Sequence, residues 1–115
     1  VDASLWSMPL WAPDCAEAVW AVVAQGRAGC YHAAGADRLP LIEFARQVAR
    51  VFGYDERLVQ PASERFLAQF ARRPRDTSFI TTKMCEELGV RPVGTREGLE
   101  AMQRTPHGLR AELRT

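Results

Sequence analysis

Apolar side chains recur at helical spacing over two long segments of the chain. Residues 13–26 and 39–52 place apolar positions three or four residues apart, and this spacing brings side chains onto one face of an α-helix. Gly26 and Gly53 follow closely on the last apolar positions and are suited to end the helices, because glycine readily adopts the left-handed conformation at a helix C-terminus. The pattern therefore predicts two amphipathic helices.

Shorter helices are predicted in the second half of the chain. Ser63 would cap a stretch through residue 70, Thr81 or Thr82 a helix that ends near Gly89, and Thr95 a last helix. Hydroxyl side chains favour such positions because they accept hydrogen bonds from the first free backbone N–H groups of a helix.

Extended segments alternate with these helices. Residues 1–9 and 77–80 lack a helical period, residues 29–33 form a short run between glycines, and residues 58–60 precede Pro61. We expect a buried strand at 29–33 and a short edge strand at 58–60, because proline cannot donate to a central ladder. The alternation of strands and helices predicts an α/β fold of short strands.

Composition narrows the classes of function. The chain has 115 residues and a net charge of +1 at pH 7, which fits one domain and gives no overall attraction to nucleic acid or to a membrane. The chain has fourteen arginines and one lysine, Lys83. A GC-rich coding sequence or anion recognition would each explain this bias. Three distant cysteines give neither a disulfide framework nor a zinc spacing, and together with the absence of a long apolar run they indicate a cytoplasmic protein.

Five short motifs, in this order, carry a resemblance to a known family. They are Pro9 with residues 14–16 (Asp-Cys-Ala), residues 29–35 (Gly-Cys-Tyr-His-Ala-Ala-Gly), residues 41–45 (Leu-Ile-Glu-Phe-Ala), residues 73–79 (Arg-Pro-Arg-Asp-Thr-Ser-Phe) and Lys83 with residues 88–90 (Leu-Gly-Val). The order and spacing of these motifs over residues 1–102 resemble the C-terminal third of extended short-chain dehydrogenase/reductases, and most closely the dTDP-4-dehydrorhamnose reductase family. Two positions depart from the family pattern: residues 4–7 (Ser-Leu-Trp-Ser) replace Asp-Gln-x-Gly, and Leu10 replaces the threonine of a Pro-Thr turn.

The resemblance implies that residues 1–115 are the C-terminal, substrate-binding part of such a reductase, with the Rossmann half absent. It implies a nucleotide-sugar substrate, with NADP or NAD bound by a full-length parent and no cofactor bound by this chain alone. A glycine-rich G-x-x-G-x-x-G loop is not found in the sequence, and neither Tyr31 nor Tyr54 has a lysine four residues later. The expected partners are therefore the nucleotide sugar, the missing Rossmann domain and a second copy in a homodimer, with no catalytic residue in the chain itself.

The best candidate binding residues lie in the fourth motif. In nucleotide-sugar epimerases that resemble this chain, an arginine and an aspartate at the positions of Arg73 and Asp76 bind the nucleotide. A guanidinium can pair with diphosphate oxygens through two hydrogen bonds, and a carboxylate can accept from ribose hydroxyls. The alternative is a solvated turn held by an ion pair between the two residues. Arg72 and Arg75 flank the turn, and solvated side chains are the simpler interpretation of both.

Other candidates have a structural and a functional interpretation. Trp11, with Trp6 nearby, could stack on a base or a sugar, or could pack in the core or against the missing domain. His32 could act as an acid or a base, although a hydrogen-bonded structural histidine is the simpler interpretation. Asp14 could bind a ligand, but a role as helix N-cap accounts for it.

Two other classes of function stay open at this point. The regulatory subunit of methionine adenosyltransferase resembles these reductases, including the Arg-Pro turn, so a non-catalytic protein of the same fold is the main alternative. Residues 42–63 also echo a helix-turn-helix, but Pro61 and the near-neutral charge argue against DNA binding.

Overall fold

A computed structural model of the protein describes residues 1–62 and 73–105. The helix predicted over residues 63–70 lies outside the described residues. Along the chain the elements are β1 (Trp6–Ser7), α1 (Ala12–Ala24), β2 (Leu39–Pro40), α2 (Leu41–Val51), the 3₁₀ turn η1 (Glu56–Leu58), the π-helical turn η2 (Met84–Leu88) and α3 (Thr95–Arg104).

The three main helices arise where the apolar period predicts them. Helices α1 and α2 begin and end within two residues of the expected positions, and Gly26 and Gly53 follow them with φ of 60° and 75°. The left-handed backbone that ends both helices is therefore confirmed at these two glycines.

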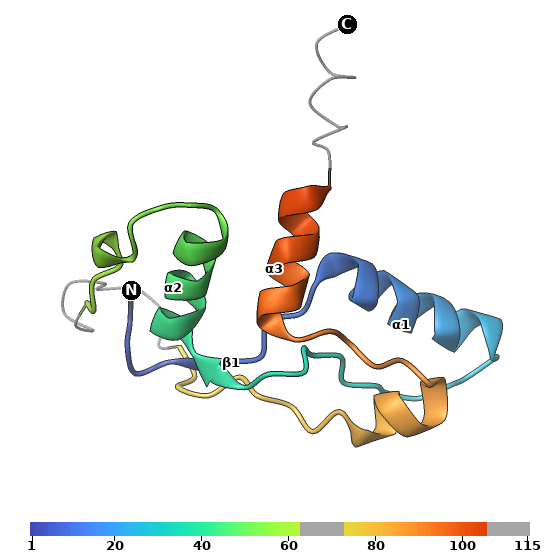
Figure 1. The fold of residues 1–115 in the computed structure, drawn as a ribbon. Helices are drawn as coiled ribbons and strands as arrows, with labels where there is room; N and C mark the ends of the chain where they lie inside the picture. Colours follow the sequence, from blue (N-terminus) through green and yellow to red (C-terminus); the bar gives the residue numbers. More distant parts are fainter. Residues whose placement is uncertain (63–72, 106–115) are drawn as a thin grey trace, which may run out of the picture.

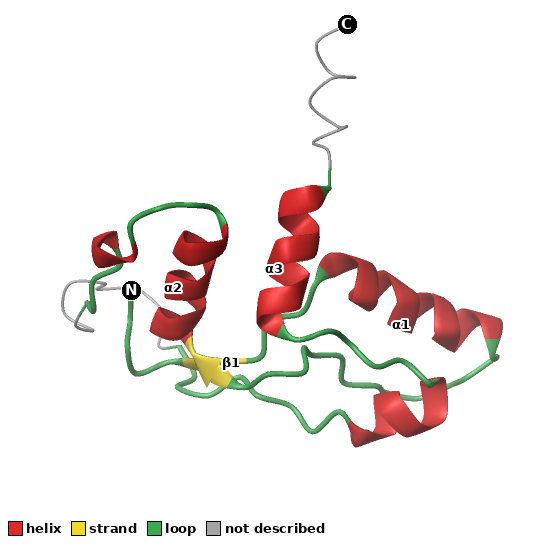
Figure 2. Ribbon diagram, in the orientation of Figure 1, coloured by secondary structure: helices red, strands yellow, loops and turns green. Residues whose placement is uncertain are grey.

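The sheet has two short strands, β1 and β2, which pair antiparallel with Trp6 opposite Pro40 and Ser7 opposite Leu39. Helices α2 and α3 stand side by side above this ribbon, whereas α1 lies to one side with η2 beneath it (Figure 1; Figure 2). The side-chain amide of Gln103 on α3 donates to the carbonyl oxygen of Val51 at 2.8 Å and ties α3 to the end of α2. The small α/β fold is thereby confirmed.

The clearest hydrophobic core lies between α1 and η2. Ala18 of α1 packs with Met84, Leu88 and Val90, all of them buried, and the ring of Tyr31 covers this cluster. Met84 is 1% exposed. Because the face of α1 that carries Ala18 is apolar, burying it against η2 stabilises the pair of elements.

Two of the predicted strands, at residues 29–33 and 58–60, do not form in the described part of the chain. Residues 29–33 belong to no strand in the described part of the chain, and the carbonyl oxygen of Cys30 accepts from the Lys83 ammonium instead, at 2.9 Å. Residues 58–60 were also wrongly predicted, because Asp55 accepts from the backbone N–H of Arg57 and starts the 3₁₀ turn η1. Local composition favoured strands at both places, but strands form only with a pairing partner.

Two predicted helix caps are also corrected. Asp14 is not the N-cap of α1, which begins at Ala12; its buried carboxylate accepts from the backbone N–H of Val93 at 3.0 Å. Thr95 is the first residue of α3 and not its cap, and its backbone N–H donates to the carboxylate of Asp37 at 2.7 Å. Each aspartate thus satisfies a backbone donor of a distant loop or helix end.

Candidate functional site

The charged turn at residues 73–78 lies directly against β1. The backbone N–H of Trp6 donates to the carbonyl oxygen of Arg75 at 2.8 Å, and the backbone N–H of Thr77 donates to the carbonyl oxygen of Trp6 at 3.1 Å. Trp6 and Asp76 also form an isolated bridge. The turn, which falls at the start of the yellow segment in Figure 1, is therefore attached to the small sheet through its backbone.

Asp76 is the most densely bonded side chain of this turn. Its Oδ2 accepts from the guanidinium of Arg38 at 2.6 Å, and its Oδ1 accepts from the backbone N–H of Ser78 at 2.9 Å and from the Ser78 hydroxyl. The Arg38 guanidinium and the two Ser78 donors lower the pKa of Asp76 to about 2. The carboxylate is therefore charged at any physiological pH.

Arg38 connects three segments at this point. Its Nε donates to the Ser78 hydroxyl at 3.0 Å, and its guanidinium carbon lies 4.1 Å from the centre of the Trp6 ring. The Arg38 and Asp76 side chains are 46% and 44% exposed, so this network borders solvent and can be reached by a ligand.

The two predicted binding residues, Arg73 and Asp76, lie on the same exposed turn. Asp76 is paired with Arg38, which the sequence did not single out, while Arg73 is exposed at the start of the same turn. Arg75 is exposed as well, and Arg72 lies outside the described residues. The structure thus gives Asp76 a partner from the loop before β2, and it presents Arg73 at the surface.

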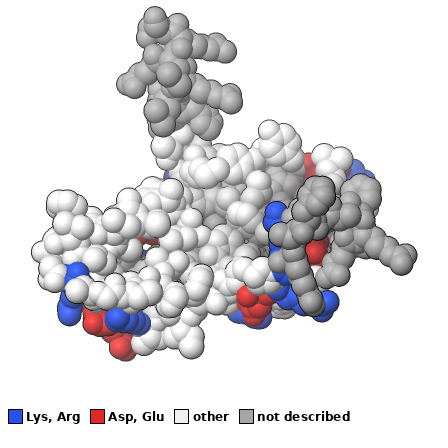
Figure 3. Space-filling model, turned by 180° about the vertical axis from the view of Figure 1, so that it is seen from behind, with Lys and Arg blue, Asp and Glu red and all other residues white. Residues whose placement is uncertain are grey.

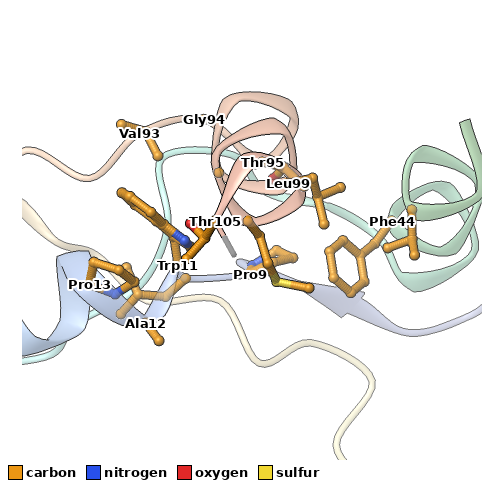
Figure 4. Close-up of a pocket in the computed structure, with 14 residues that line it drawn as sticks. Pro9, Trp11, Ala12, Pro13, Phe44, Val93, Gly94, Thr95, Leu99 and Thr105 are labelled. Carbon is orange, nitrogen blue, oxygen red and sulfur yellow. The ribbon is translucent and has the colours of Figure 1, made fainter. Parts of the chain in front are cut away.

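Trp11 does not belong to the charged turn but lines an apolar pocket of about 490 Å³. The pocket is bounded by the turn that enters α1, by one face of α2 and by α3 (Figure 4). Its lining is Pro9, Leu10, Trp11, Ala12, Pro13, Phe44, Val48, Val93, Gly94, Thr95, Gly98, Leu99, Met102 and Thr105. Because residues 73–78 do not line it, the structure does not bring Trp11 together with Arg73 and Asp76.

Glycines permit the close packing around this pocket. A Cβ atom on Gly98 would lie 3.2 Å from the Cβ of Trp11, and a Cβ on Gly35 would overlap the carbonyl oxygen of Pro9. The first contact lets α3 approach the Trp11 turn, and the second fixes that turn against the loop before β2.

The remaining candidates have structural contacts. The Trp6 ring lies beneath the Arg38 guanidinium, and the ring of His32 stacks on Phe79 with centroids 4.7 Å apart and an interplanar angle of 16°. Within residues 1–62 and 73–105, no group of three or more His, Cys, Asp or Glu side chains could hold a metal ion. Over the same ranges, no helix is long and apolar enough to cross a membrane.

Sequence reasoning missed Arg38, Asp37 and Ser78. Arg38 and Asp37 lie in a loop without periodicity, and their partners are 38 and 58 residues away along the chain. Ser78 had a local signal, because a serine two residues after an aspartate is typical of a turn in which the carboxylate accepts from the backbone.

The structure defines a small α/β domain with an exposed charged turn beside its two-stranded sheet. Residues 2–106 match the model of the RmlD substrate binding domain, and the chain belongs to this family. It is 30% identical over 88 residues to a dTDP-4-keto-6-deoxy-D-glucose reductase of Streptomyces niveus, a match that covers 76% of this chain and 30% of that protein. No solved structure matches significantly.

These matches confirm the resemblance to the nucleotide-sugar reductases and support a substrate-binding role of that kind. They give no support to the alternative of a regulatory subunit of methionine adenosyltransferase. The chain spans less than a third of the length of the curated relative.

Proposed function

We propose that this chain is the substrate-binding portion of an NAD(P)H-dependent nucleotide-sugar reductase, and that the turn from Arg73 to Asp76 binds the nucleotide. The observation that carries the proposal is the turn itself: an oriented, charged carboxylate and, three residues earlier, an exposed arginine lie on one turn whose backbone is tied to β1. Membership of the RmlD substrate binding family supports the class of ligand.

The chemistry of the two side chains suits the two ends of a nucleoside diphosphate. The Arg73 guanidinium can donate two parallel hydrogen bonds to diphosphate oxygens, in the fork geometry that favours arginine over lysine. Asp76 has two oxygens with about four acceptor sites, of which Arg38 and Ser78 occupy three. A ribose hydroxyl can donate to the acceptor site that is left.

Trp11 remains a proposed substrate contact on separate grounds. Its ring borders the apolar pocket (Figure 4), and an indole can stack on a planar base or on the apolar face of a sugar. Trp11 would then contact a different portion of the ligand from the charged turn.

The reductase would need a cofactor-binding part outside this chain. The residues present do not fit a dinucleotide, since no glycine-rich loop opens a helix here to receive its pyrophosphate. We therefore assign NADP or NAD, and the catalytic Tyr-Lys pair, to a Rossmann domain of a longer, cytoplasmic protein. The substrate-binding portion would supply orientation of the sugar and exclusion of water.

An exposed apolar face on α1 supports contact with such a domain. Val19, Trp20 and Val23 are 61%, 68% and 65% exposed and follow one another at helical spacing. Seen from behind, charged side chains also gather in separate groups with a broad uncharged surface between them (Figure 3). A contiguous apolar face on a folded domain is typical of a protein interface. We propose that this face contacts the Rossmann domain, with a second copy of the chain as the other candidate.

The proposal is tested by the affinity for dTDP-glucose, measured by isothermal titration calorimetry. Arg73→Ala should weaken binding about tenfold or more, because charge-assisted hydrogen bonds to the diphosphate are lost. Arg91→Ala is the matched control, since Arg91 is also exposed but lies outside the turn. Equal affinities of the Arg73→Ala and Arg91→Ala variants would contradict the proposal.

A further inference from the structure

Arg38 is joined to the proposed binding turn and to β1 by contacts of three kinds. Its guanidinium forms a charged hydrogen bond with Asp76, a second hydrogen bond with the Ser78 hydroxyl, and a cation–π contact with the ring of Trp6. The loop that carries it is itself fixed, because Asp37 holds the first backbone N–H of α3 and Gly35 abuts the Pro9 carbonyl.

The contacts of Arg38 fix the orientation of the Asp76 carboxylate rather than the position of the turn's backbone. The backbone of the turn is already held to Trp6 by two hydrogen bonds and does not need Arg38 to stay in place. Ion pairs between half-exposed side chains also add little to the stability of a fold. A planar guanidinium that lies on an aromatic ring and donates in two directions does, however, fix the plane in which it meets a carboxylate.

We propose that Arg38 is a positioning residue for nucleotide binding: it holds the Asp76 carboxylate in one orientation, so that its one remaining acceptor site faces the ligand. The inference rests on the proposed function and extends it to a residue outside the turn. Preorganisation of this kind increases affinity because the ligand does not have to order the side chain when it binds.

Other charged groups near Asp76 do not replace Arg38. Arg75 immediately precedes Asp76 in the chain; hydrogen bonds from Ser4 are the main cause of the lowered pKa of Asp2, and the charge of Arg75 adds a smaller contribution there. The hydrogen bond from Arg38 remains the largest cause of the lowered pKa of Asp76. Removing the Arg38 side chain should therefore remove the largest cause of this lowered pKa and leave the two Ser78 donors in place.

The test compares variants of the purified protein in binding dTDP-glucose and in the titration of Asp76, followed by carbon-detected NMR. Arg38→Ala should weaken binding about tenfold and raise the pKa of Asp76, with the melting temperature little changed. Arg38→Lys keeps the charge but not the two-directional contact, so it should recover the pKa of Asp76 more fully than the affinity. The control is Arg57→Ala, which breaks a guanidinium–carboxylate pair of 2.8 Å with Asp55 away from the turn and should change neither quantity.

A double variant separates positioning from general loosening of the fold. If Arg38 acts through Asp76, Arg38→Ala should cost no further affinity once Asp76→Asn is present. A full additional loss in the Asp76→Asn background would overturn the inference, as would unchanged binding by Arg38→Ala when Arg73→Ala is impaired. If the unaltered protein does not bind dTDP-glucose, the proposed function fails and the inference fails with it.

Discussion

Single carboxylates position much of the irregular chain. Asp14 accepts from the backbone of Val93, Asp37 accepts from the backbone of Thr95, and Asp76 accepts from that of Ser78. Loops carry backbone donors that no helix or sheet satisfies, and a carboxylate supplies the missing acceptor. The sequence shows that these residues are aspartates, but the two distant partners depend on the folded arrangement and could not be predicted.

Replacing Asp14 by alanine should destabilise the protein by about 1–3 kcal/mol, because the partly buried N–H of Val93 would lose its acceptor. Glu17→Ala is the control, since Glu17 is an exposed acid on the same helix. Chemical denaturation would measure both changes. Equal stability of the two variants would show that the bond from Val93 contributes nothing.

Gly35→Ala should be among the most damaging small substitutions. The added Cβ would overlap the carbonyl oxygen of Pro9, which is backbone and cannot rotate away, so we expect a loss of about 3 kcal/mol or more. Gly53→Ala should cost about 1 kcal/mol, because Gly53 has a left-handed backbone but open space around it. Thermal unfolding of the two variants shows which one loses more stability. A smaller loss for Gly35→Ala than for Gly53→Ala would contradict the contact with Pro9.

The pKa of Asp76 gives a prediction about acid conditions. A carboxyl whose pKa is lowered on folding adds stability that is fully present above its unfolded value, near 4, and is lost as pH falls toward the folded value of about 2. Unfolding followed between pH 5 and pH 2 should therefore show a smaller loss of stability for Asp76→Asn than for the unaltered protein. Identical pH dependence in the two would argue against the bond to Arg38.

Among the secondary-structure elements, the helices were predicted well and the strands poorly. The apolar period located α1 and α2, and Thr95 marked the start of α3; such local signals suffice because a helix satisfies its hydrogen bonds within its own segment. A strand needs a partner, and neither residues 29–33 nor residues 58–60 pair in a sheet within the described part of the chain. The strands that do form, β1 and β2, have two residues each and are too short for an alternating pattern to be visible.

Met84 tests the packing between α1 and η2. It is the largest side chain that is fully buried among the described residues, and Met84→Ala should cost about 2–5 kcal/mol by leaving a cavity. Met102→Ala should cost far less, since Met102 is 49% exposed at the border of the pocket. Unfolding by urea distinguishes the two, and equal losses would contradict a core centred on η2.

At the scale of the whole molecule, the order of motifs gave the family, and the structure added the geometry of the site. The resemblance over residues 1–102 agrees with the family match over residues 2–106. The turn from Arg73 to Asp76 could be identified as a candidate through the resemblance to the family, and its residue types suit a nucleotide. The contacts of Arg38 could not be predicted, since its partners Asp76 and Ser78 lie 38 and 40 positions further along the chain.

The exposed face of α1 has a consequence for a longer protein that contains this chain. Trp20→Glu should leave the stability of this chain almost unchanged, because the side chain is 68% exposed. The same substitution should lower the melting temperature of the longer protein, where we propose that Trp20 is covered. Equal effects in the two contexts would exclude this face as the contact with the Rossmann domain.

Locating the bound nucleotide on the protein is the most direct test of the proposed function. Backbone amide shifts of the isotope-labelled protein, followed by NMR during titration with dTDP-glucose, locate the ligand without any substitution. We expect the largest shifts on residues 73–79 and on Trp6, with Arg38 affected as well. Shifts confined to the pocket around Trp11, Phe44 and Met102, or no shifts at all, would contradict the proposed function.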